Sequence, residues 1–184
     1  MVKFNLDLFR PGDGIVVKHT KGFFGDRIIR RQLKKGFKPK DTKFTHIEVL
    51  IARDRKDPSK FWSNRVAPPK AKLVNFPEFY KGRYIKIVRY KHYESFSRLA
   101  EVATWAATHV NVPYDIPGIL SFLSFLRSWI KQHTSWWFCI ESYIFSHQQV
   151  YLDSFDNLKP HKAMPAHALQ PEYTDVIWEG VIPG

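Results

Sequence analysis

The sequence predicts an α+β domain in which an antiparallel β-sheet packs against helices. Runs rich in β-branched and aromatic residues dominate the first half of the 184 residues. Segments with helical periodicity dominate the second half, and one more β-rich run stands near the end. Strands and helices segregated in this way are typical of α+β domains, whereas regular alternation indicates a parallel sheet. We therefore expect one domain over residues 1–184.

Each expected strand has a local signature of alternating or apolar residues bounded by turn residues. The turn PGDG at 11–14 precedes the first strand, and a charged turn at 53–59 separates a hairpin pair. The expected strands and extended segments cover residues 15–17, 44–52, 61–66, 73–76, 84–90 and 173–180.

The expected helices are marked by apolar residues three and four positions apart. The first is a basic amphipathic helix within residues 18–43, which Gly36 ends. The others are expected over 96–110, 119–130 and 136–151, the last with Cys139 in its first turn. Prolines in the tail favour extended loops packed on the domain.

Composition predicts a folded, basic protein with an anionic partner. Apolar residues make up 44% of the chain and aromatic residues 16%, which argues against disorder. The net charge of +12 favours nucleic acid, anionic lipid or an acidic cell-wall polymer. The N-terminal residues lack the pattern of a secretory signal, and the apolar run 116–130 is too short to span a bilayer. We expect a soluble protein. The sequence does not identify its compartment, and both a cytoplasmic and a phage-associated location are compatible with it.

Two residues far apart in the chain indicate thiol chemistry. Cys139 is the only cysteine, so it is either a buried small hydrophobic residue or a thiol kept for chemistry. His46 begins the strand-like run THIEVLI at 45–51. A thiol and an imidazole joined by folding are the minimum parts of a thiolate nucleophile with its base.

Five short motifs in a particular order resemble the circularly permuted papain-like proteins. This superfamily includes permuted NlpC-type cell-wall amidases and peptidases (the YiiX-like proteins) and the lecithin:retinol acyltransferases. The histidine strand precedes the cysteine helix in them. The resembling segments are PGDGIVV at 11–17, THIEV at 45–49, NVPYD at 111–115, FCIES at 138–142 and MPAHAL at 164–169.

The resemblance implies a permuted papain-like fold and a cysteine hydrolase or acyltransferase of the thiol protease type. Cys139 would be the nucleophile and His46 its base. The substrate would be a cell-wall peptide amide or a lipid acyl group. Tyr114 would lie near the site and contact substrate, and Glu141 would brace the cysteine helix.

The third catalytic residue has three candidates. The family often carries a glutamate on the strand after the histidine, but here that stretch reads FWSNRV. Asn64 is our choice, because an amide oxygen accepts from an imidazole N–H. Ser63 is the alternative if the register shifts by one. Glu48 is another, because it lies two residues after His46 and shares its strand face.

The remaining polar residues favour simpler interpretations. The seven other histidines have no metal-ligand spacing, so we expect surface or loop positions for them and no metal or cofactor. Arg30 and Arg31 of the basic segment are candidate contacts for an anionic substrate, lipid surface or cell-wall polymer; a solvated face is the alternative. Nucleic acid is disfavoured because no binding motif appears. A non-catalytic binding module and a basic virion component remain alternative functions.

Overall fold

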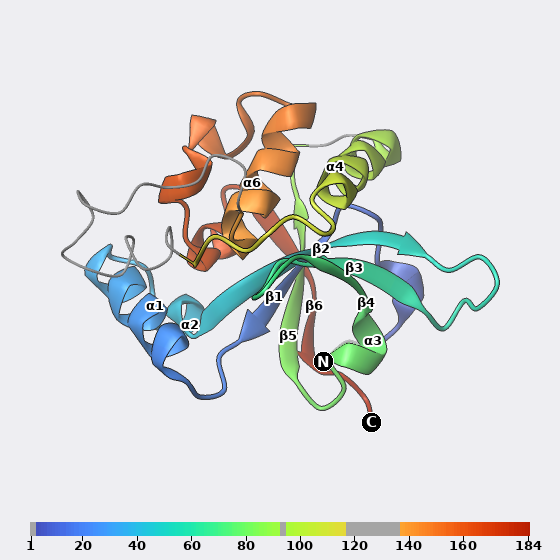
Figure 1. Cartoon of the computed structure of the whole chain (residues 1–184), viewed down its shortest axis with the longest axis horizontal. Coiled ribbons are helices and arrows are strands. Elements are labelled where there is room, and N and C mark those ends of the chain that lie inside the picture. Colours follow the sequence, from blue (N-terminus) through green and yellow to red (C-terminus); the bar gives the residue numbers. More distant parts are fainter. Residues whose placement is uncertain (1–2, 93–94, 117–136) are drawn as a thin grey trace.

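A six-stranded antiparallel sheet is the centre of the fold (Figure 1). The computed structural model describes residues 3–92, 95–116 and 137–184. Within them the strand order is β4-β3-β2-β1-β5-β6, and every neighbouring pair is antiparallel. The strands are β1 (Gly14–Lys18), β2 (Phe44–Arg53), β3 (Phe61–Arg65), β4 (Lys72–Asn75), β5 (Tyr84–Tyr90) and β6 (Thr174–Val181). The expected α+β class with an antiparallel sheet is confirmed.

Three of the described helices lie where periodicity predicts them, with differences at their ends, and two short helices of four residues each were not expected. They are α1 (Phe23–Lys34), α2 (Pro39–Thr42), α3 (Phe76–Phe79), α4 (Phe96–Thr108) and α6 (Cys139–Val150). The helix expected over 119–130 lies outside the described residues. The proline-rich tail, expected to be extended, folds into 3-10 turns, because proline is well tolerated in the first turn of a helix. The turns Pro160–Lys162 and Pro165–Leu169 begin with proline, whereas the turn Ser154–Asn157 contains none.

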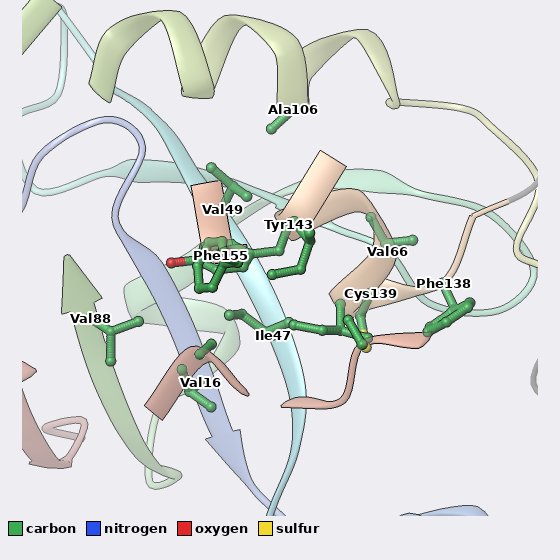
Figure 2. Close-up of a cluster of buried hydrophobic side chains, with 14 of the residues drawn as sticks. Val16, Ile47, Val49, Val66, Val88, Ala106, Phe138, Cys139, Tyr143 and Phe155 are labelled. Atoms are coloured by element: carbon green, nitrogen blue, oxygen red, sulfur yellow. The ribbon is translucent and has the colours of Figure 1, made fainter. Parts of the chain in front are cut away.

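Hydrophobic residues form a separate cluster on each face of the sheet. On one face, α4 and α6 pack against each other and against β2, and part of this cluster is drawn in Figure 2. Ile47 and Val49 of β2 point into it together with Cys139. On the other face, Leu50 of β2 joins Tyr80 and aromatic residues of the N-terminal segment. Since side chains alternate along a strand, Glu48 lies on the Leu50 face.

Two irregularities in strand pairing lie at the part of β2 that carries His46. Val17 pairs with His46 and Lys18 with Phe44, so Thr45 is a bulge residue without a partner in β1. On the other side of β2, the last pair with β3 joins Val49 to Asn64. Bulges re-aim neighbouring side chains, and a strand without a partner leaves backbone N–H groups available.

The loop before α6 is held by backbone pairing with residues 113–115. Trp137 N–H donates to the Pro113 carbonyl at 3.3 Å, and Asp115 N–H donates to the Trp137 carbonyl at 3.1 Å. Tyr114 N–H in turn donates to the Pro69 carbonyl at 3.0 Å. These contacts place the start of α6 beside the end of β3.

Across the described ranges, no helix is both long and apolar enough to span a bilayer.

Candidate active site

Cys139 is the first residue of α6, and its sulfur meets the free edge of β2. Phe138 precedes it in extended conformation, with φ −112° and ψ 164°. The sulfur accepts hydrogen bonds from the backbone N–H groups of Ile47 and Ile140. Strand N–H groups lie in the plane of the sheet, so the thiol approaches β2 from its edge rather than over its face. Figure 2 shows Cys139 at the base of α6 near Ile47 and Val66.

His46 lies between Cys139 and Glu48. Its imidazole is hydrogen-bonded to the Cys139 sulfur. Its Nε2 lies 2.9 Å from Glu48 Oε1, which leaves Nδ1 for the sulfur. A carboxylate accepts only, so Nε2 carries a proton and donates to it. The three groups therefore form a continuous chain from thiol to imidazole to carboxylate.

Electrostatic interactions among Cys139, His46 and Glu48 favour a thiolate–imidazolium pair. Burial by itself would lower the pKa of His46, but the Cys139 and Glu48 charges and their hydrogen bonds raise it to about 9. Burial by itself would raise the pKa of Cys139, but the His46 charge and the hydrogen bonds from His46, Ile47 and Ile140 lower it. Each group thus stabilises the charged form of the other. The N-terminus of α6 adds a further preference for negative charge on the sulfur.

Glu48 is a buried carboxylate with a full set of donors. It is 1% exposed. Ser63 Oγ donates to its Oε2 at 2.8 Å, and the Tyr80 hydroxyl donates to its Oε1. Arg65 Nε lies 3.7 Å from the same Oε1, and the Arg65 guanidinium stacks 4.8 Å from the Phe79 ring. Such partners are what allows an ionised carboxylate to remain buried.

Asn64 does not contact the imidazole that we expected it to orient. Asn64 Nδ2 donates to the Ala106 carbonyl at 2.6 Å, so the amide faces α4 and not the imidazole. The strand register explains this, because Asn64 pairs with Val49, whose side chain points to the α4 and α6 face. Glu48, one of the two alternatives, holds the imidazole, and Ser63, the other, supports Glu48.

Tyr114 lies close to the thiol and to Asp115, and Asp115 also lies close to Glu141. Burial raises the pKa of Tyr114 well above its usual value, and the Cys139 and Asp115 charges raise it further, so the phenol stays protonated. Burial also raises the pKa of Glu141 to about 7, against a hydrogen bond from Phe138 N–H, and the Asp115 charge adds to the rise. The bond from Phe138 places Glu141 as a brace at the start of α6.

The expectation that Arg30 and Arg31 contact an anionic substrate stays a prediction. Both belong to α1, which packs beside the start of β2 (Figure 1). Within the described residues, the hydrogen bonds and ion pairs that hold His46 and Glu48 come from β2, β3, Tyr80 and Cys139. Within the same residues, no three histidine, cysteine or acidic side chains gather as metal ligands.

Two other histidines correct the expectation of surface positions. His109 is 5% exposed and His147 is fully buried. His109 Nδ1 lies 2.7 Å from Ser142 Oγ, and its ring stacks on Trp137. Burial lowers the pKa of His109 to about 4 and that of His147 to about 3, so both are neutral core residues. Nothing in their sequence spacing distinguishes them from loop histidines.

Sequence reasoning did not single out Tyr80 and Arg65. Both reach Glu48 only through tertiary folding, Tyr80 from the end of α3 and Arg65 from the end of β3.

Comparison of the chain with models of protein families and with curated proteins found no match.

Proposed function

We propose that this chain is a cysteine-dependent hydrolase or acyltransferase with a circularly permuted papain-like fold. The observation that carries the proposal is the hydrogen-bonded chain from Cys139 through His46 to buried Glu48. The order of the elements also supports it, because the histidine strand precedes the cysteine helix. A peptide amide of the cell-wall type is the favoured substrate, and a lipid acyl group is the other substrate class.

In the first step, the Cys139 thiolate attacks the carbonyl carbon of an amide or ester. A carbon–sulfur bond forms, and the carbonyl electron pair moves to oxygen. As the tetrahedral intermediate collapses, the bond to the leaving nitrogen or oxygen breaks. The His46 imidazolium gives its Nδ1 proton to that leaving group.

In the second step, water or an acceptor nucleophile attacks the thioester. Neutral His46 takes the proton of the attacking group, and Cys139 leaves as thiolate. Glu48 accepts from Nε2–H in both steps, so that Nδ1 always faces the sulfur. The thiolate–imidazolium pair is restored at the end of the cycle.

Stabilisation of the oxyanion is assigned to donors around Cys139. Backbone N–H groups at the start of α6 are suited to this role because they have no partners within the helix. The protonated Tyr114 hydroxyl is the side-chain candidate, since it lies near the sulfur and is kept neutral by its surroundings. A neutral phenol donates one hydrogen bond to a developing negative charge.

The burial of Cys139 favours the alternative function of a non-catalytic module of the same fold. Cys139 is only 5% exposed and belongs to the cluster under α4 and α6. An ordinary core cysteine, however, lacks an ionic partner, whereas this sulfur pairs with an imidazole. Thiol reactivity therefore separates the two functions.

The test is alkylation by iodoacetamide across a range of pH, followed by intact-mass measurement. We expect single labelling of the folded protein at pH 6, with labelling lost in Cys139→Ser. Peptidoglycan peptides and acyl lipids are then offered separately, and a thioester adduct on Cys139 identifies the substrate class. If the thiol reacts only in denaturant, the protein is not a cysteine enzyme.

A further inference from the structure

We propose that the outer face of α1 docks on the surface of an anionic phospholipid bilayer. This inference does not rest on the proposed enzyme activity, because it concerns a different part of the molecule. It commits to a partner that the net charge alone does not choose.

The positive charge of the chain is concentrated around α1. Residues 18–43 hold ten lysines and arginines against two aspartates, out of a net charge of +12 for the whole chain. One of the two, Asp26, is paired with His19, whose Nε2 lies 3.0 Å from Asp26 Oδ1. An anionic surface attracts clustered lysines and arginines within about one Debye length.

The cations lie in a row on the exposed side of the helix. Arg27, Arg30 and Lys34 follow Phe23 at intervals of four, three and four residues, which places them in one line along α1. All of these residues are exposed. The opposite side is fixed to the protein through Ile28 and Gln32, which are buried.

Phenylalanine at the beginning of α1 distinguishes a membrane from other polyanions. Phe23 is 64% exposed and Phe24 is 47% exposed, with ring centroids 5.7 Å apart. The Arg27 guanidinium lies 4.6 Å from the Phe23 centroid. Neighbouring exposed aromatic rings bordered by cations suit the boundary between headgroups and acyl chains, where the rings leave water and the cations meet phosphate. A soluble acidic polymer offers the rings no apolar phase.

Gln32 holds this surface in a fixed orientation. Its Nε2 donates to the carbonyls of Thr42 and Phe44 at 2.9 and 3.1 Å, and its Oε1 accepts from Ala166 N–H at 2.7 Å. The helix is thus tied to β2 and to the turn Pro165–Leu169. A surface that is already oriented loses little conformational entropy on docking.

The experiment is co-sedimentation with vesicles of phosphatidylcholine alone or mixed with phosphatidylglycerol, in a Cys139→Ala background that prevents turnover. We expect binding only to the mixed vesicles, weakened by added salt. Replacing Arg27, Arg30 and Lys34 with glutamine should weaken partitioning by at least about tenfold. Changing Phe23 and Phe24 to serine should also weaken it, with little effect on salt dependence.

The matched control substitutions lie elsewhere on the surface. Glutamine at Arg55, Lys56 and Lys72 removes the same charge, near the β2–β3 turn and on β4, away from α1 (Figure 1). Phe96→Ser removes a ring that is 56% exposed. Both controls should bind like the parent, and circular dichroism checks that all variants fold.

Two results would overturn the proposal. One is equal loss of binding in the control variants, which would mean that net charge alone acts. The other is binding to duplex DNA or an acidic cell-wall polymer that matches vesicle binding and is unchanged in the phenylalanine variant. Because every protein in the assay lacks the thiol, failure here leaves the proposed enzyme activity untouched.

Discussion

Glu48 follows His46 by two residues on β2, and its Oε1 lies 2.9 Å from the Nε2 of that imidazole. The period of a strand places both side chains on one face without any help from the rest of the fold. Tertiary structure adds the burial of Glu48 and its donors. The pair therefore orients the imidazole from within a single strand, while the thiol arrives from a distant helix.

Glu48→Gln tests whether the carboxylate charge sets the reactivity of the thiol. Glutamine keeps an acceptor oxygen of the same shape but loses the negative charge. We expect the pKa of His46 to fall from about 9 and the pKa of Cys139 to rise. One pKa unit is a tenfold change in thiolate when the thiol is mostly protonated, so labelling by iodoacetamide at pH 6 should slow by about tenfold or more.

Asn64→Ala is the matched comparison for Glu48→Gln. Asn64 donates to the Ala106 carbonyl, so its loss should cost about 1–3 kcal/mol of unfolding free energy in urea. The pH profile of Cys139 labelling should stay as in the parent. A profile that shifts in Asn64→Ala but not in Glu48→Gln would return the orienting role to Asn64.

Tyr80→Phe tests the support of the buried carboxylate. The Tyr80 hydroxyl donates to Glu48 Oε1, and Tyr80 is 2% exposed. Losing a donor to a buried charge should cost about 1.5–3 kcal/mol in urea unfolding. Tyr84→Phe is the control, since its hydroxyl donates to Glu179, which is 40% exposed, and water replaces the lost donor. Equal costs for the two variants would contradict the importance of burial.

Local patterns predict the six described strands and the three longer described helices, but not the short α2 and α3, and they single out part of the candidate site. The spacing of apolar residues identifies β5, α4 and α6 because each buries one continuous face. The same reasoning leaves Glu48 as one candidate of three, because its partners come from α3 and β3 and no local pattern encodes their approach. The structure does not bring Asn64 to the imidazole for a related reason, since its register against Val49 turns its side chain toward α4.

Glu141→Gln tests a partly buried carboxyl in the first turn of α6 through the pH dependence of stability. Burial raises the pKa of Glu141 from 4.5 to about 7. The folded state therefore holds a proton that the unfolded state has released between these values, and its stability contribution is full below pH 4.5 and lost as pH rises through about 7. Glutamine removes this loss, so the variant should gain stability relative to the parent as pH rises, by at most about 1.4 kcal/mol per pH unit.

The measurement for Glu141→Gln is thermal or urea unfolding at several pH values from 4 to 8. Glutamine still offers an oxygen to Phe138 N–H, so the start of α6 should be kept. Parallel stability curves for the variant and the parent would mean that Glu141 titrates alike in both states.

Gln32→Met tests whether one side chain ties α1 to the rest of the fold. Methionine has a similar length but makes no such hydrogen bonds, so it leaves two buried carbonyls and the Ala166 N–H without the partner they had. An unsatisfied buried group costs about 1–3 kcal/mol, so the free energy of unfolding should fall by at least about 2 kcal/mol. Gln149→Met on the exposed surface of α6 is the control and should stay within about 0.5 kcal/mol of the parent.

In Gln32→Met, amide hydrogen exchange should quicken in α1 more than in α6, because loss of these hydrogen bonds frees α1 first. Uniform quickening across the chain would instead mean that α1 and the sheet unfold as one unit.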